Sequence, residues 1–174
     1  MSSVFYNLLI GPVLKRLRMD YRLTSRQVLL CRAFALKYLK AYEKGTLKRI
    51  KKRLENHYAR KGLPRAVIEN IETWLEGLVR SEEYALAREY DGLLRGVLDK
   101  WEIPEYVRGM YYAFANRVVG LARKHSGKAL DRAIKAVIMY NTGAYGLSRP
   151  CLMELAQLTV TYYEKITESM FRSR

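Results

Sequence analysis

Apolar residues recur at helical spacing along almost the entire chain, and this periodicity limits the fold more than any other feature of the sequence. Val67, Ile71 and Leu75, for example, share one face of a predicted helix. Strand-like alternation of apolar and polar residues is rare, and three of the four prolines stand where helices are expected to begin. The sequence therefore predicts an all-α fold of about seven helices with short connections.

The first part of the chain carries recognisable helix boundaries. We expect a first helix over residues 3–19, interrupted or kinked where Pro12 follows Gly11. Thr24 and Gln27 have the spacing of a capping box, in which each side chain binds the backbone of the other residue, so a second helix is expected to start there. A third helix, after a short turn, carries the densest run of basic residues.

The second part, from Pro64 onward, has the pattern of four or five antiparallel helices. A loop is expected over residues 141–150, before the last helix. The sequence thus predicts two domains: a basic, helical, nucleic-acid-binding arm over residues 1–65 and a helical bundle for assembly over residues 66–174.

Charge is distributed unevenly along the chain, which has a formal net charge of +15. Residues 1–65 contain 17 Lys/Arg and 3 Asp/Glu, residues 66–105 contain 4 and 10, and residues 106–174 contain 11 and 4. An excess of positive charge concentrated at one end indicates a polyanionic partner, and the acidic stretch suits a neighbour's basic surface or the exterior of an assembly.

The densest basic stretch, residues 37–65, contains only two acidic residues, Glu43 and Glu55. A solvated helix face normally mixes both signs, because like charges one turn apart repel. Lysine predominates in the densest block, and lysine is suited to phosphates more than to base edges. The candidate nucleic-acid-binding residues are Lys15, Arg16, Arg18, Arg22, Arg26, Lys37, Lys40, Lys44, Lys48, Arg49, Lys51, Lys52, Arg53, Arg60, Lys61 and Arg65.

Two other interpretations of this surface stay open. A basic amphipathic helix can lie on an anionic membrane, and residues 3–19 have enough apolar side chains for a membrane or a partner subunit. Tyr38, Tyr42 and Tyr58 either stack on bases or pack in the core. A membrane contact is the less favoured of the two polyanion interpretations, because the basic third helix offers only a thin apolar stripe.

No pattern of residues indicates catalysis. His57 and Arg60 have the H-x-x-R spacing of tyrosine recombinases, but no convincing sequence context for a second arginine and a nucleophilic tyrosine accompanies them. The two histidines and two cysteines are too far apart in sequence to indicate a metal site. We therefore predict a protein that is not an enzyme and that needs no cofactor or metal.

The cysteines and the apolar segments indicate the cellular location that we expect for the protein. Two cysteines, Cys31 and Cys151, are too few for a disulfide framework, so buried core thiols are expected, with one long-range disulfide as the alternative. No run of about 18 consecutive apolar residues is present, and the order of the N-terminal segment is not that of a secretory signal. These features predict an intracellular protein.

Three kinds of nucleic-acid-binding protein fit these observations. A helix-turn-helix regulator would use residues 46–60 as its recognition helix, although few base-reading side chains stand there. The small helical subunit of a CRISPR effector complex is similar in size and charge. A chromatin-type DNA-binding protein is the third alternative, and it is a DNA-binding protein like the helix-turn-helix regulator.

A basic helical arm followed by a more neutral helical bundle resembles the major capsid proteins of filamentous and rod-shaped archaeal viruses, with KRIKKRLENHYARK as the densest part of the arm. The resemblance implies that the N-terminal helices wrap double-stranded DNA, held in A-form, while the bundles pack side by side as the shell. It also implies a dimeric building block with itself or a related second capsid protein, a helical filament, and a place in the virion after assembly in the host cytoplasm. The high charge and few Asn and Gln suit a thermophilic source.

Overall fold

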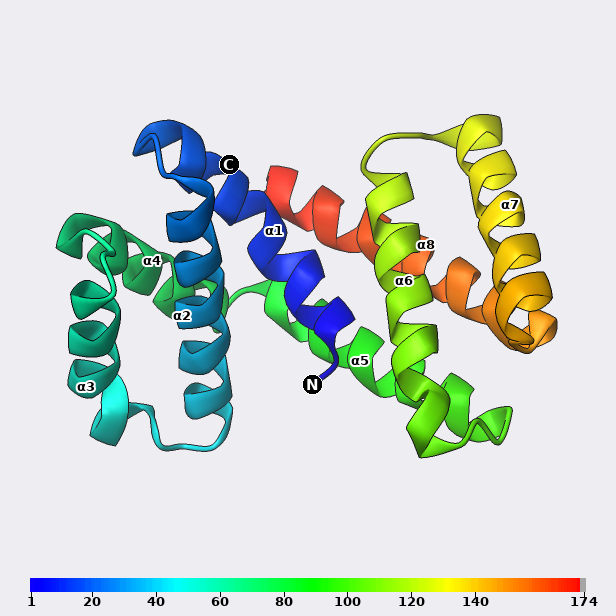
Figure 1. Ribbon diagram of the computed structural model, residues 1–174, viewed down its shortest axis with the longest axis horizontal. Helices are drawn as coiled ribbons and strands as arrows, with labels where there is room; N and C mark the ends of the chain where they lie inside the picture. Colours follow the sequence, from blue (N-terminus) through cyan, green and yellow to red (C-terminus); the bar gives the residue numbers. More distant parts are fainter. Residues whose placement is uncertain (173–174) are drawn as a thin grey trace. The chain divides into compact units, whose positions relative to one another are not determined.

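The predicted all-α fold is confirmed by the computed structural model, which describes residues 1–172 (Figure 1). Over these residues it contains eight α-helices, one short 3-10 helix and no strand. The elements, in chain order, are α1 (Ser3–Asp20), α2 (Ser25–Glu43), α3 (Leu47–Arg60), α4 (Arg65–Leu78), α5 (Glu82–Lys100), η1 (Glu105–Val107), α6 (Arg108–Ala122), α7 (Gly127–Tyr145) and α8 (Arg149–Arg172).

Two details of the helices can be compared with the expectation. Helix α1 runs through Pro12 as one element, so the expected interruption is absent, and the alternative of a kink at Pro12 stays a prediction. Helix α7 extends to Tyr145, through the first half of the expected loop. The Asn141 side chain donates a 2.8 Å hydrogen bond to the Val137 carbonyl inside the helix, and the helix stops only where Gly146 adopts a left-handed conformation.

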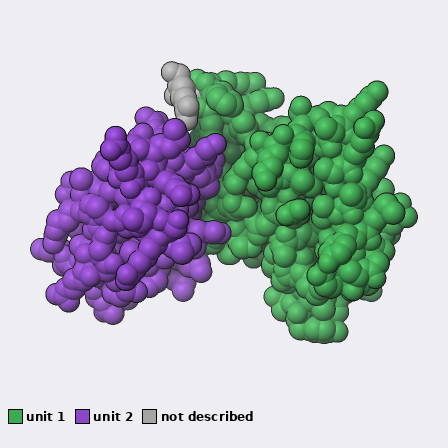
Figure 2. All heavy atoms as spheres, turned by 45° about the horizontal axis from the view of Figure 1, so that its top comes forward, with its two compact units in different colours: residues 1–8, 82–174 green, residues 9–81 purple. Residues whose placement is uncertain are grey.

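The chain forms two compact units, which Figure 2 shows in different colours. One unit comprises residues 9–81, and the other comprises residues 1–8 together with the chain from Glu82 onward. This division lies elsewhere than the expected boundary after residue 65, because α4 packs against both α2 and α3. The apolar face that the sequence placed on α4, with Val67, Ile71 and Leu75, is buried in this unit.

The unit of residues 9–81 is organised around α2, α3 and α4. The expected capping box is confirmed: the Thr24 side chain accepts a hydrogen bond from the Gln27 backbone, and the Gln27 side chain accepts one from the Thr24 backbone. Phe34 on α2 and Tyr58 on α3 meet edge to face, with ring centroids 5.5 Å apart. Both rings are buried, so they fix the two helices against each other.

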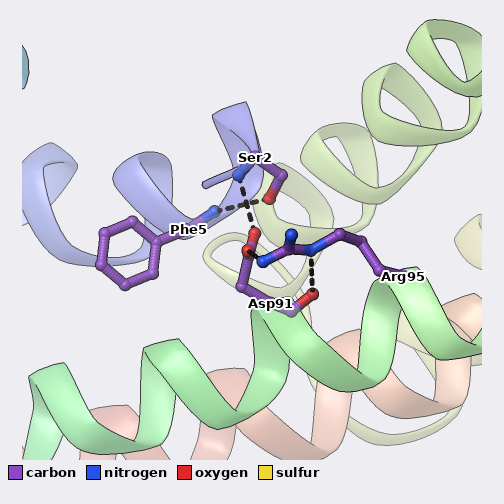
Figure 3. Close-up of polar contacts among 4 residues, drawn as sticks. All are labelled: Ser2, Phe5, Asp91 and Arg95. Atoms are coloured by element: carbon purple, nitrogen blue, oxygen red, sulfur yellow. Dashed lines mark hydrogen bonds and ion pairs between the residues drawn. The ribbon is translucent and has the colours of Figure 1, made fainter. Parts of the chain in front are cut away.

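The other unit is a bundle in which α8 contacts α5, α6 and α7 (Figure 1). Tyr90 on α5 and Thr159 on α8 share a buried hydrogen bond of 2.9 Å. The first residues of the chain belong to this bundle, because the ring of Phe5 packs edge-on against Tyr84 at 5.5 Å. Figure 3 shows that the backbone N–H of Ser2 also binds the carboxylate of Asp91 on α5.

Cys31 and Cys151 are both buried and unpaired, as the expectation of core thiols required. Burial raises the pKa of each thiol to about 11. Across residues 1–172, no helix combines the length and the apolar character that crossing a membrane would require.

Candidate nucleic-acid interface

The positive charge of the chain is concentrated in one of the two compact units. Residues 9–81 contain 18 Lys/Arg and 6 Asp/Glu, whereas the remaining residues contain 14 and 11. A net charge of +12 out of +15 therefore belongs to the unit built on α2, α3 and α4. Any polyanion is attracted first to this unit.

Helices α2 and α3 run side by side in opposite directions, joined by a three-residue turn (Figure 1). Between them lies an open groove with a volume of about 830 Å³. The side chains of Ile50 and Leu54 give it an apolar floor. No acidic side chain is among its described lining residues, which are Lys37, Ile50, Arg53, Leu54, Asn56, His57, Arg60 and Lys61.

The local helix geometry explains why these basic side chains meet. Arg53, His57 and Arg60 follow one another at spacings of four and three residues, so they occupy one face of α3. Lys37 reaches the groove from α2, and Lys61 follows immediately after the last residue of α3. The groove is thus lined by four Lys and Arg side chains, with Lys37 on α2 and the other three on α3 or directly after it.

Tyr58 is a common neighbour for three of these basic side chains. Its ring is buried, with 2% of its surface exposed. The ammonium groups of Lys37 and Lys61 lie 5.6 Å and 5.9 Å from the ring centroid, and the His57 ring lies 5.1 Å from it, edge to face. Cation–π attraction to an aromatic face holds such ammonium groups in place without neutralising their charge.

The electrostatic field of the groove acts on His57. Desolvation, together with the positive charges of Lys61, Lys37 and Arg53, lowers the pKa of the imidazole below its ordinary value. Like charges around a basic group disfavour its protonated form. His57 is therefore neutral at pH 7, and its environment is one that lacks a counter-anion.

A different arrangement exists where α3 faces α4. The ammonium group of Lys51 lies 3.0 Å from a carboxylate oxygen of Glu76 and 3.7 Å from one of Glu72. The hydrogen bond to Glu76 is the main cause that raises the pKa of Lys51. Lys51, one of the expected nucleic-acid contacts, is thus half-buried and already paired with acids inside the unit.

The Glu72 carboxyl is the most perturbed acid of this cluster. Its side chain is buried, and burial together with a hydrogen bond and charge repulsion from Glu55 raises its pKa to about 7. Lys51 opposes this effect only in part. Glu55 therefore lies close enough to Glu72 to disfavour the charged form of its carboxyl.

The remaining candidate residues are spread over the surface of the same unit. Arg16 forms an ion pair with Asp20 at 3.5 Å, and Arg22 adopts a left-handed backbone conformation in the turn before α2. The structure brings Lys37, Arg53, Arg60 and Lys61 together in the groove. The other candidates are exposed outside it: Lys15, Arg16, Arg18, Arg22, Arg26, Lys40, Lys44, Lys48, Arg49, Lys52 and Arg65.

The structure answers the question about the tyrosines and adds residues to the site. Tyr38 and Tyr58 are buried, so they pack in the core, whereas Tyr42 remains 42% exposed.

His57 and Asn56 line the groove although neither was among the candidate nucleic-acid-binding residues. The signal for His57 was present in the sequence, because it stands one helical turn after Arg53 and one before Arg60 or Lys61.

In residues 1–172, no three His, Cys, Asp or Glu side chains lie close enough together to hold a metal ion. Comparison of the chain with protein-family models, with curated proteins and with solved structures finds no match. The functional argument therefore depends on the residues of this chain and on their geometry.

Proposed function

We propose that this protein binds double-stranded DNA without sequence preference and packages it in a helical assembly, as the major capsid protein of a filamentous or rod-shaped virus does. The observation that carries the proposal is the groove between α2 and α3, whose charged lining residues are all basic. Phosphates spaced along a nucleic-acid backbone match a line of cations, and the release of condensed counterions supplies the affinity.

The chemistry of the groove favours the backbone over the bases. Two of the four Lys and Arg residues of the groove are lysines, whose ammonium groups make compact, non-directional contacts with phosphates, and the guanidinium groups of Arg53 and Arg60 bind phosphates as well. Base recognition requires Arg, Asn or Gln side chains to enter a groove of the duplex on a helix, whereas Arg53, Asn56 and Arg60 line a groove of the protein itself. We therefore expect little discrimination between sequences.

The arrangement of α2 and α3 also bears on the helix-turn-helix alternative. In that motif the two helices cross steeply, and the second helix inserts into the major groove. Here the two helices run alongside each other in opposite directions (Figure 1). The groove that both of them line favours contact along a nucleic-acid backbone. The small CRISPR-effector subunit remains the alternative that single-stranded RNA binding would favour.

The first experiment is a titration of a random duplex and of a matched single strand at several salt concentrations. The four Lys and Arg residues of the groove predict a slope of log affinity against log salt of about −3.6 for duplex DNA if each contacts one phosphate, and a steeper slope if outlying cations join them. Equal affinity for unrelated duplexes supports the proposal. Absence of salt-dependent duplex binding contradicts it.

A pair of double variants separates the groove from general charge. Lys37→Gln with Lys61→Gln removes two groove cations, whereas Lys128→Gln with Lys135→Gln removes two exposed cations from α7 in the other unit. Both lower the net charge by the same amount. Only the groove variant is expected to reduce the slope by nearly 2 and to prevent filaments with DNA in electron micrographs.

A further inference from the structure

Three basic side chains that line the groove share one aromatic neighbour, Tyr58. Lys37 on α2, His57 on α3 and Lys61 just after α3 all lie within 6 Å of the Tyr58 ring centroid. We infer that these three side chains form a phosphate-binding subsite, and that His57 takes up a proton when a phosphate group enters it. The inference rests on the proposed function, because it names what one part of that groove holds.

The positions of the positive charges favour an anion at this place in the groove. Two ammonium groups held beside one neutral ring repel each other, and no described lining residue of the groove is an acid that compensates them. An anion that enters the groove within reach of both Lys37 and Lys61 turns this repulsion into two attractive contacts. Phosphate fits best, because it offers several acceptor oxygens to donors that approach from different sides.

A helix end offers another reason for cations at this place, since Lys61 and Arg60 stand where the α3 dipole is negative. The carbonyls of His57, Tyr58 and Ala59 in the last turn of α3 already accept hydrogen bonds from the backbone, however. The N–H of Lys61 binds the carbonyls of His57 and Tyr58, and the N–H of Gly62 binds that of Ala59. The side chains are left to project into the groove, as their place in its lining shows.

The proposed proton uptake by His57 results from the change of charge around it when a phosphate binds. In the free protein, desolvation and the cations Lys61, Lys37 and Arg53 hold the pKa of His57 low. A bound phosphate neutralises those cations and adds negative charge nearby, which raises the same pKa. Binding and protonation are therefore linked, and affinity rises as pH falls toward the pKa of His57 in the bound state.

Other titrating groups must be separated from His57. The charged and titratable side chains around it are Lys37, Arg53, Tyr58, Arg60 and Lys61. Glu72, with a pKa raised to about 7, titrates in the same range, and it interacts with Glu55, Lys51 and Glu76. A Glu72→Gln background therefore isolates the contribution of His57.

The chain offers a matched control, because it contains only two histidines and His125 belongs to the other unit. The two imidazole pKa values are measured by NMR in the free protein, with a random DNA duplex, and with inorganic tripolyphosphate. We expect duplex binding to raise the pKa of His57 by about one unit, and to make binding tighter at pH 5.5 than at pH 7.5 by up to about tenfold.

Calorimetry in two buffers of different ionisation enthalpy measures the proton uptake directly. We expect uptake in the Glu72→Gln background, its loss on adding His57→Gln, and its retention on adding His125→Gln. Duplex binding with an unchanged His57 pKa overturns the subsite and leaves the proposed function intact. Absence of duplex binding overturns the proposed function. If duplex DNA does not bind but tripolyphosphate raises the pKa of His57, the subsite is supported as one for a free polyphosphate. If tripolyphosphate also leaves the pKa of His57 unchanged, the phosphate subsite is overturned.

Discussion

The carboxylate of Asp91 accepts a hydrogen bond of 2.7 Å from the backbone N–H of Ser2, 89 positions earlier in the chain. Its other oxygen accepts a 2.8 Å hydrogen bond from Arg95 (Figure 3). The start of α1 is thereby attached to the bundle of α5–α8, while the later turns of α1 belong to the basic unit. The chain therefore leaves the bundle within α1 and returns to it at α5.

Replacing Asp91 by alanine is expected to release the start of α1. The buried carboxylate is 1% exposed, and its loss leaves the N–H of Ser2 without this acceptor, at a cost of roughly 1–3 kcal/mol in the free energy of unfolding. Denaturant titration measures the loss. Arg95→Ala is the control, because that side chain is 56% exposed and its removal should cost less than 1 kcal/mol. Equal losses in both variants would contradict the attachment.

Lys51 and Lys52 are neighbours with different expected roles. Lys51→Gln removes the partner of Glu76 and Glu72 and should lower the free energy of unfolding by about 1 kcal/mol, with little change in the salt dependence of DNA binding. Lys52→Gln removes an exposed cation and should leave stability unchanged. If Lys52 contacts a phosphate, the salt slope falls by about 0.9. A reversed pattern would place Lys51 in the DNA interface.

The pKa of Glu72 makes stability depend on pH in a specific direction. Because its folded pKa is raised from 4.5 to about 7, the stabilisation from its protonated form is complete below pH 4.5 and is lost as pH rises through 7. Glu72→Gln keeps a neutral side chain and should stabilise the protein at pH 8 by about 1–2 kcal/mol relative to the wild type. Thermal unfolding at pH 5 and pH 8 measures the difference.

Glu76 is the control for Glu72, because its pKa is shifted in the opposite direction. Its hydrogen bond to Lys51 lowers its pKa, so its contribution to stability is present above its unfolded pKa and is lost as pH falls. Glu76→Gln should therefore destabilise the protein at pH 8 and have less effect in acid. A Glu72→Gln variant that loses stability at pH 8 would contradict the raised pKa of Glu72.

Tyr90→Phe tests whether the bundle and the groove can be altered separately. The substitution removes a buried hydrogen bond to Thr159 and should cost about 1 kcal/mol in the free energy of unfolding. Thr159 also donates to the Leu155 carbonyl, so its hydroxyl keeps one partner. DNA affinity at fixed salt should stay within twofold of the wild type. A larger loss of affinity would mean that DNA binding depends on the bundle.

The sequence determined the helices and several of their ends by local chemistry. The capping box of Thr24 and Gln27 and the stop at Gly45, whose φ is +66°, each involve residues close together in the chain. The apolar face of α4 followed from periodicity in the same way. Local signals were weaker at α7, where Asn and Gly suggested a loop but the helix continues to Tyr145.

Only the tertiary structure decided which charges act together. Lys51 and Lys52 are adjacent lysines in the segment KRIKKRLENHYARK, and the sequence does not distinguish their roles. In the structure Lys51 faces α4 and forms ion pairs with Glu72 and Glu76, whereas Lys52 is exposed. The convergence of Lys37 on His57 and Lys61 depends on the antiparallel packing of α2 and α3, which places residues 20 or more positions apart around one tyrosine. Helix periodicity fixes which side of a helix a residue occupies, whereas the packing of buried side chains such as Phe34 and Tyr58 fixes what that side faces.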